Sequence, residues 1–473
     1  MANGPRGRGS VPRRLGPLDA AAEVLGRAAG AAVRKAGLGA GHSLPGAIVE
    51  RLVPGYLARR AATLPDGTVA VSGTNGKTTT ASMLRTILRE AGVPTVGNES
   101  GANLSRGVVS ALVAMPRGTR LGVFEVDEAV LARHAAELAP RVVVLTNIFR
   151  DQLDRFAETE MVAGLFRRTL AQVPGVLVVA NADDPLLWRA VEEFDPLGFG
   201  VAPLPGAGPG GADAEPEACP RCGRVPVYAG RTMAHLGRAS CTACGWRSPE
   251  PAVVAEVLPG GGIDRLELAL PGGRVVLPVG GVHNAYNAAA AVAAAGALGV
   301  GAAEAVRGLA AFRPRFGRAE ALTLGGRPAW VFLMKNPAGA GVVVREVAAD
   351  PKVGAVVLAV SDQVSDGRDI SWIWDADFER LAAAGLPVVP AGRRAADVAV
   401  RLRYAGAEPA PAEEDPAAAL RAALARCPAG KGIAVLATYT AMLDVRHAIT
   451  RTRRDRMLDV RAGGAGDAGE RNR

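Results

Sequence analysis

The stretch VAVSGTNGKTTTASMLRTIL, residues 69–88, decides the fold. It begins with an apolar run of strand type, and after a glycine-rich turn its apolar residues recur at helical spacing. A loop between such a strand and such a helix directs backbone N–H groups and the helix N-terminus toward phosphate. We therefore predict a nucleotide site formed by Gly73, Thr74, Asn75, Gly76, Lys77, Thr78 and Thr79.

Two residues of this loop are predicted to make specific contacts with the nucleotide and its metal ion. Lys77 is expected to reach the terminal phosphates, and the Thr78 hydroxyl is expected to ligate Mg²⁺. Glu125, at the end of the strand-like run 122–128, is a second candidate for holding Mg²⁺. The general phosphate-binding loop has glycine six residues before its lysine, where this chain has Val71, so the loop is a shorter G-T-N-G-K-T variant.

Short apolar runs alternate with helical patterns through two parts of the chain. The first part has runs at 122–128, 141–147 and 175–181, and the second at 355–362, 387–392 and 433–439. This alternation is typical of parallel sheets covered by helices. The predicted fold class is therefore α/β, with a central ATP-binding parallel-sheet domain and a C-terminal α/β domain.

Four of the five cysteines form a C-x2-C-x18-C-x2-C pattern. Cys219 and Cys222 make the first pair, and Cys241 and Cys244 the second. Two knuckles at this spacing can place four thiolates around Zn²⁺, and a closed four-cysteine site is structural because it leaves no position for a reacting water. We predict a zinc ribbon at about residues 216–250, inserted in the central domain.

Composition limits the remaining possibilities. The chain has 473 residues and a formal charge of +9, yet only five lysines, and no arginine run interleaves with aromatic residues as in a nucleic-acid groove. We therefore expect no nucleic-acid partner. The apolar run at 285–299 is interrupted by Asn287 and is not a membrane span. Residues 1–14 are interpreted as a disordered leader, 15–60 as an N-terminal helical segment and 461–473 as a disordered tail, in a cytoplasmic protein.

The loop and four further segments together resemble the Mur ligase superfamily of ATP-dependent enzymes that join amines to carboxylates. These segments are TNIFRDQLDRFAE at 146–158, NADDP at 181–185, HNAYNAAAA at 283–291 and RFGRAE at 315–320. The resemblance implies a central ATPase domain over residues 61–312 and a C-terminal domain over 313–460. It implies that Asn287 lies near the adenine, and Arg318 is expected to clamp phosphate. Other polar residues expected near the nucleotide, each of which could equally be a cap or a buried polar group, are Asn147, Asp151, Asp154, His283 and Asn284.

Further features indicate which members of the Mur ligase superfamily the chain resembles. Many Mur ligases hold a second metal with a carbamylated lysine, but this chain has no lysine between Lys77 and Lys335. With the ribbon, MKNPAG at 334–339 and SDGRDISWIWD at 365–375, the chain resembles the ligase-like subunits of lipid II isoglutaminyl synthases. That resemblance implies amidation of the α-carboxylate of D-Glu in the lipid II stem peptide through an acyl phosphate, at the inner face of the membrane. The alternatives are a stand-alone amino-acid ligase of the folylpolyglutamate type and, from another class, a zinc-ribbon nucleic-acid-binding ATPase.

The source of ammonia can be considered from the residues. Releasing ammonia from glutamine needs a reactive cysteine with a nearby base. The fifth cysteine, Cys427, lies at a helix end with no histidine near it in sequence. Either free ammonia or a separate glutaminase is needed, and the resemblance implies a GatD-type glutamine amidotransferase as partner.

The acidic and aromatic segment 361–379 is the candidate meeting point of the two proteins. Asp362 ends a predicted strand and is expected to face the nucleotide. The resemblance implies that an aspartate of this loop completes the partner's Cys–His pair as an orienting acid; we favour Asp366, with Asp369 next. Trp372 and Trp374 would point the same way if the chain is extended, as core residues or as interface anchors, with core favoured.

Overall fold

The structure is a computed structural model that describes residues 15–35, 43–98, 104–150, 159–204, 218–314 and 318–450. Within these residues, nine strands form one sheet in the order β11-β10-β9-β6-β5-β4-β1-β3-β2, parallel from β2 to β9 and antiparallel from β9 to β11. Its strands are β1 (Thr68–Ser72), β2 (Thr95–Val96), β3 (Leu121–Glu125), β4 (Val142–Leu145), β5 (Leu177–Asn181), β6 (Leu197–Val201), β9 (Val253–Val257), β10 (Leu266–Leu270) and β11 (Gly273–Leu277).

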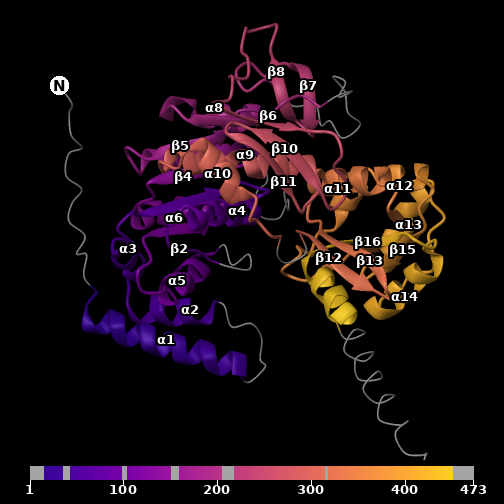
Figure 1. Ribbon diagram of the computed structural model, residues 1–473, viewed down its shortest axis with the longest axis horizontal. Coiled ribbons are helices and arrows are strands. Elements are labelled where there is room, and N and C mark those ends of the chain that lie inside the picture. The colour runs from indigo at the N-terminus through magenta and orange to yellow at the C-terminus, as the bar shows by residue number, and fades with distance from the viewer. Residues whose placement is uncertain are drawn as a thin grey trace, which may run out of the picture.

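Helices cover both faces of this sheet, as its fully buried strands β1 and β3 require. The helices are α4 (Lys77–Glu90), α5 (Ser105–Val113), α6 (Glu128–Leu138), α7 (Thr159–Ala171), α8 (Pro185–Val191), the 3₁₀ turn η1 (Glu192–Phe194), α9 (Val282–Ala297) and α10 (Ala302–Leu309). The alanine-rich α9 is buried along most of its length between the sheet and α4 (Figure 1). Its small side chains let it approach both neighbours closely.

Three helices precede the sheet: α1 (Pro17–Lys35), α2 (Leu44–Leu52) and α3 (Tyr56–Ala61). The hairpin of β7 (Val227–Met233) and β8 (Leu236–Ser240) lies between the two cysteine pairs in the sequence and projects from the β6 side of the sheet (Figure 1). No helix among the described residues combines the length and the apolar character needed to cross a bilayer.

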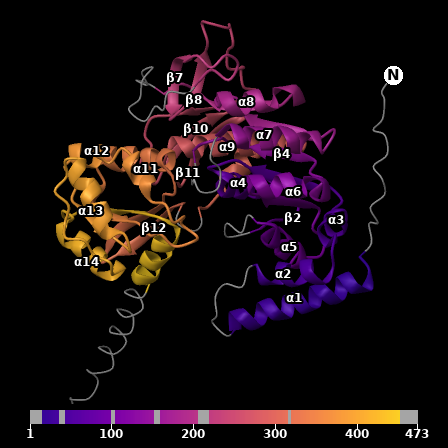
Figure 2. The same cartoon turned by 180° about the vertical axis from the view of Figure 1, so that it is seen from behind.

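A second sheet follows, in the order β12-β13-β16-β14-β15, with only the β12–β13 pair antiparallel. The two views show it beside the first sheet, reached through α10 and β12 (Figures 1 and 2). The strands of this sheet are β12 (Arg318–Leu324), β13 (Arg327–Leu333), β14 (Val353–Ala359), β15 (Val388–Ala391) and β16 (Gly432–Ala437). The helices of the same part of the chain are α11 (Pro337–Ala349), the 3₁₀ turn η2 (Ser371–Trp374), α12 (Glu379–Ala383), α13 (Ala395–Tyr404), α14 (Pro416–Arg426) and a helix over 439–450. The predicted α/β class is confirmed.

Candidate active site

The phosphate loop, residues 73–78, lies at the carboxyl end of β1. The chain order of the sheet changes direction here, because β3 lies on one side of β1 and β4 on the other. Open α/β sheets bind ligands at such a point. Gly73 and Gly76 have φ values of 125° and 88°. A Cβ at Gly73 would clash with the Thr146 hydroxyl and one at Gly76 with the Asn287 amide, so both positions require glycine.

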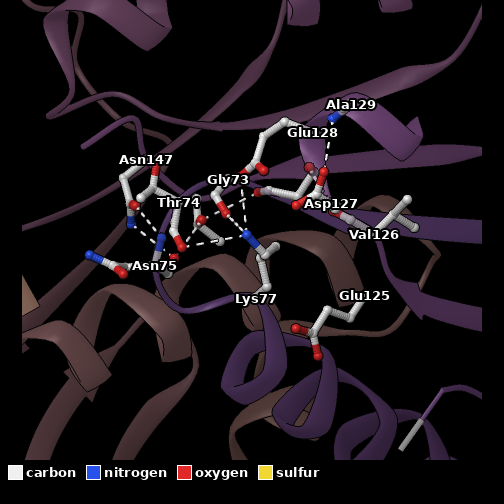
Figure 3. Close-up of polar contacts among 12 residues, drawn as sticks. Gly73, Thr74, Asn75, Lys77, Glu125, Val126, Asp127, Glu128, Ala129 and Asn147 are labelled. Carbon is white, nitrogen blue, oxygen red and sulfur yellow. Dashed lines mark hydrogen bonds and ion pairs between the residues drawn. The ribbon is translucent and has the colours of Figure 1, made fainter. Parts of the chain in front are cut away.

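The end of β4 holds the loop from one side. The Thr74 N–H donates to the Asn147 carbonyl at 2.9 Å, and the Asn75 N–H donates to Asn147 Oδ1 at 2.8 Å. The Thr146 hydroxyl donates to the Asn75 carbonyl at 2.7 Å. Figure 3 shows Asn147 beside Asn75 at the tip of the loop. The predicted position of Asn147, just beyond a strand, is thereby explained: it shapes the backbone that would contact phosphate.

Lys77 is buried at the first turn of α4, between the loop and an acidic turn (Figure 3). Its Nζ donates to the Gly73 carbonyl and lies 3.0 Å from Glu128 Oε1. Burial alone would lower the pKa of Lys77, but the carboxylates of Glu128, Glu125 and Asp127 outweigh it and raise that pKa above its ordinary value. Lys77 is therefore a fully charged group, held ready beside the loop.

The Thr78 hydroxyl donates to Glu125 Oε2 at 2.6 Å, as expected if the two residues share a ligand. Asn98, which sequence reasoning missed, exchanges two bonds with the Glu125 backbone and so fixes the end of β3. Adjacent oxygens around Mg²⁺ lie about 2.9 Å apart, given ligand distances of roughly 2.0–2.1 Å. The Thr78 and Glu125 oxygens come close to that spacing, so this donor pair fits Mg²⁺. Thr79 is buried in the same helical turn.

The N-terminus of α9 faces the first turn of α4. The Thr80 hydroxyl donates to Asn287 Oδ1 at 3.2 Å, and Asn287 Nδ2 donates to Asn284 Oδ1 at 3.1 Å. Asn284 also donates to the Gly280 carbonyl and lies 3.0 Å from His283 Nε2. The predicted residues His283, Asn284 and Asn287 therefore lie together in one polar network beside the phosphate loop, in which the two asparagines are buried and His283 is partly buried.

Asn336 brings the C-terminal part of the chain to the same loop. Its Nδ2 donates to Asn75 Oδ1 at 3.1 Å, while its Oδ1 accepts from the Gly339 N–H and caps α11. Sequence reasoning noted the surrounding segment but not this residue; asparagine directly before a proline at a helix start was the available signal. It also missed Glu128. The predicted residues Asp151 and Asp154, and the side chain of Arg318 at the start of β12, lie outside the described residues.

The four cysteines form one cluster whose sulfur atoms all lie within 4.8 Å of one another. Two contacts are shorter, at 3.7 Å between Cys219 and Cys244 and 3.5 Å between Cys222 and Cys241. These distances are too long for a disulfide, which is about 2.05 Å. Sulfurs placed tetrahedrally around an ion with bonds of about 2.3 Å lie roughly 3.8 Å apart, so the cluster fits a metal of this kind.

The two knuckles have the same backbone. The Gly223 N–H donates to the Cys219 carbonyl and the Gly245 N–H to the Cys241 carbonyl, each at 2.9 Å. Both glycines have positive φ, at 75° and 73°. The repeated turn explains why the spacing alone located the cluster.

The three predicted aspartates of segment 361–379 have different surroundings. Asp362 forms ion pairs with Arg393 at 3.2 Å and Arg394 at 3.7 Å. Asp366 is buried and accepts both the N–H, at 2.8 Å, and the hydroxyl of Thr440, in the first turn of the helix over 439–450. Asp369 is exposed.

The two tryptophans do not lie on an extended chain. They belong to η2, where Ile373 is buried and Trp374 is half exposed, its ring edge-on to Tyr404 at 5.4 Å between centroids. Arg401 of α13 donates to the Ile373 carbonyl and holds this turn in place. The favoured interpretation of both tryptophans as core residues is wrong for Trp374, because a 3₁₀ turn separates neighbouring side chains onto different faces.

Comparison with known proteins agrees with this geometry. Residues 71–201 match the Mur ligase middle domain, and residues 333–442 match the MurT ligase C-terminal family. A pseudomurein peptide ligase type C from Methanothermus fervidus has the same fold, with a TM-score of 0.64, 23% identity, and coverage of 81% of this chain and 78% of that one. The fold and the phosphate loop thus define a ligase of the Mur class, a family that is ATP-dependent.

Two curated relatives specify the family further. The MurT subunit of lipid II isoglutaminyl synthase (glutamine-hydrolyzing) from Streptococcus pneumoniae is 32% identical over 418 residues, covering 86% of this chain and 92% of that protein. The Staphylococcus aureus MurT subunit is 32% identical over 390 residues, covering 81% and 86%. The chain belongs to the MurT family.

Proposed function

We propose that this chain amidates the α-carboxylate of D-Glu in the stem peptide of lipid II, giving D-isoglutamine during peptidoglycan synthesis. The reaction takes place in the cytoplasm at the inner face of the membrane. The observation that carries the proposal is the complete phosphate loop, with Lys77 and the Thr78–Glu125 pair, in a chain of the MurT family.

The chemistry follows from the loop. The acceptor carboxylate oxygen attacks the γ-phosphorus of ATP, ADP leaves, and an acyl phosphate forms. Ammonia then attacks the acyl carbon, phosphate leaves, and the amide remains after loss of a proton. The loop N–H groups and the Lys77 ammonium would bind the phosphates and offset the charge that develops on them. Thr78 and Glu125 would hold a Mg²⁺ ion, which supplies further positive charge to the phosphate oxygens when bound.

Ammonia is proposed to come from a second protein, a GatD-type glutaminase. Cys427 is buried, and the contacts of its Sγ are the backbone carbonyls of Pro428, Lys431 and Gly432 at 3.5–3.7 Å. A thiol placed this way cannot reach a substrate amide. The relatives are themselves named as subunits, which supports a partner.

Segment 361–379 is the proposed contact with that partner. Asp366 is buried and its carboxylate is held by the Thr440 N–H and hydroxyl, so its orientation is fixed, as an orienting acid requires. The exposed ring of Trp374 with Tyr404 offers the kind of aromatic anchor found at protein interfaces. Asp362, facing Arg393 and Arg394, is the proposed nucleotide-side acid.

The cysteine cluster is proposed to bind one structural Zn²⁺. Metal analysis of the purified chain should give about one zinc per chain. Cys222→Ser should remove the metal and unfold the ribbon, because the small hairpin buries few apolar side chains of its own. Metal-free protein with an ordered ribbon would contradict this assignment.

The test of the main proposal is a reconstitution. The chain is supplied with ATP, a lipid II acceptor and either ammonium or glutamine, with and without a candidate glutaminase. Acceptor-dependent phosphate release should occur with ammonium alone, and glutamine should replace ammonium only with the partner. Amidation from glutamine by this chain alone would overturn the division of labour. Consumption of an amino acid instead of ammonia would favour the stand-alone amino-acid ligase.

A further inference from the structure

Helix α1 turns its acidic residues toward the protein. Asp19 and Glu23 are both buried. Asp19 Oδ1 lies 2.8 Å from Arg59 Nη2, and Glu23 Oε1 accepts from the Tyr56 hydroxyl at 2.7 Å. Both partners belong to α3, so the charges of α1 are used to attach it to the rest of the molecule.

Three further inward residues of α1 are small. Ala22, Gly26 and Gly30 lie four residues apart and are buried against the neighbouring helices. A Cβ added to Gly26 would lie 3.1 Å from the Pro45 carbonyl oxygen, because α2 approaches so closely. Around Gly26 the inward face therefore has no room for a large apolar side chain.

Three of the four large apolar residues of α1 lie on the opposite face, toward solvent, whereas the fourth, Val33, is partly buried. Leu18, Val24 and Leu25 are 77%, 65% and 56% exposed. Exposed alanines at 21, 28 and 32 continue the same face along the helix. A surface helix of a globular protein normally has the reverse arrangement. In both views α1 lies at the edge of the molecule, beyond α2 (Figures 1 and 2).

The exposed charged residues that the structure describes on α1 are cationic. Both acids of α1 are buried, whereas Lys35 is exposed, and Arg27 is exposed but forms an ion pair with Glu23. Before the helix, the sequence of residues 1–14 contains four arginines, at 6, 8, 13 and 14, and no acid. Apolar side chains flanked by cations complement a surface that is apolar inside and anionic outside, which describes a bilayer with acidic lipids.

We propose that the outer face of α1, defined by Leu18, Val24 and Leu25 with the alanines between them, binds an anionic lipid surface and lies flat in its interface. One narrow helix face is small beside the roughly 800 Å² per partner that a stable dimer buries, which disfavours a second copy of the chain as occupant. The inference deepens the proposed function, on which its biological purpose rests: the surface would hold the enzyme on the leaflet that displays a lipid-linked substrate.

Vesicle flotation with the full chain tests this surface. Vesicles of equal parts phosphatidylglycerol and phosphatidylcholine should bind the protein, and binding should weaken with added salt. The combined variant Leu18→Gln, Val24→Gln and Leu25→Gln should lose vesicle affinity on the order of tenfold or more, because it removes the inserted apolar groups while keeping every charge. The matched control places glutamine at three exposed apolar residues elsewhere, Leu177, Val225 and Val276, and should bind as the unaltered chain does.

Several outcomes would overturn the inference. These are absence of vesicle binding by the unaltered chain, equal binding by the α1 variant, and equal loss in the control. A dimer that only the α1 variant dissociates would assign the face to a second copy. A glutaminase complex lost only in that variant, with vesicle binding intact, would assign it to the partner.

The same variants separate this surface from the proposed reaction. With a water-soluble acceptor analogue and ammonium, the α1 variant should turn over as fast as the unaltered chain. Vesicle binding without amidation of any acceptor would leave the membrane surface in place and remove the proposed reaction. Amidation without vesicle binding would support the proposed reaction and overturn the membrane-binding inference.

Discussion

The phosphate loop, residues 73–78, and segment 361–379 both lie at the carboxyl ends of parallel strands, β1 and β14, yet they are held in different ways. In the phosphate loop, the Asn75 N–H, the Thr78 hydroxyl and the Lys77 ammonium are each held by a bond to a neighbouring element of the same domain. In segment 361–379 only Asp366 has such bonds among the three candidate aspartates, while Trp374 faces solvent. This difference is what the two proposed roles require: the phosphate loop would work with groups of its own chain, whereas segment 361–379 would leave exposed groups for a partner.

The largest effect should come from the phosphate loop. Lys77→Met should lower both the ammonium-driven and the glutamine-driven reactions on the order of 1,000-fold, because the phosphates lose their buried cation. Phosphate release measured with each nitrogen source checks this.

Removing the lysine also leaves Glu128 buried without its cation, which destabilises the fold by about 3–5 kcal/mol. The double variant Lys77→Met with Glu128→Gln restores a neutral site and is the folding control. Substantial activity in this folded double variant would contradict the role of Lys77.

A smaller and selective effect is expected in segment 361–379. Asp366→Asn should lower only the glutamine-driven reaction, by about 100-fold, because ammonium bypasses the partner's active site. Parallel assays with the two nitrogen sources measure the difference.

Thr440→Val separates this role from a structural one. It deletes the hydroxyl that Asp366 accepts but leaves the carboxylate. If Asp366 only caps the helix over 439–450, the two variants should behave alike and both reactions should fall together. That result would assign Asp366 a structural role, and the proposed difference between the phosphate loop and segment 361–379 would no longer hold.

A third variant measures how tightly the phosphate loop is built. Gly76→Ala places a Cβ against the Asn287 amide, so nucleotide binding should weaken roughly tenfold, or about 1.4 kcal/mol. Gly92→Ala is the matched control, since Gly92 has a similar φ of 75° and nothing within 4 Å of its Cβ position. Both should lose about 1 kcal/mol of stability from the backbone, but only Gly76→Ala should affect titrations with ATP.

The parts of the fold and the site also differ in how well they can be predicted from the sequence. The phosphate loop and the cysteine knuckles were found because their contacts repeat at short, fixed spacings, and the parallel sheets because their strands are apolar on both faces. Glu128 and Asn98 were missed, since a buried counter-ion and a backbone clamp leave no spacing signal. The Asp366–Thr440 bond joins residues 74 positions apart, so only the packing of β14 beside β16 brings them together.

The exposure of the two tryptophans depends on the local conformation of a few residues. Alternation across Ile373 would place both rings on one side of an extended chain, but the chain forms the 3₁₀ turn η2 instead, and Asp369, just before it, accepts the Ser371 N–H at 2.8 Å. A local bond of this kind, from a side chain to the backbone two residues on, competes with extended structure. Sequence patterns therefore locate the segment but do not decide which of its side chains face outward.

The smallest effect should come from the bond between the Asp369 carboxylate and the Ser371 N–H. The Ser371 N–H lowers the pKa of Asp369 below its ordinary value, so the contribution of the carboxylate to stability is present above that value and is lost as the pH falls through the folded-state pKa. Asparagine keeps the accepting oxygen, and the site is exposed, so Asp369→Asn should cost only a few tenths of a kcal/mol at neutral pH and nothing in acid. Urea unfolding at both pH values measures this, with glutamine-driven activity expected to stay unchanged. If Asp369→Asn instead removed glutamine-driven activity while Asp366→Asn did not, the exposed aspartate would be the one that serves the partner, and the buried one would belong with the structural bonds of the fold.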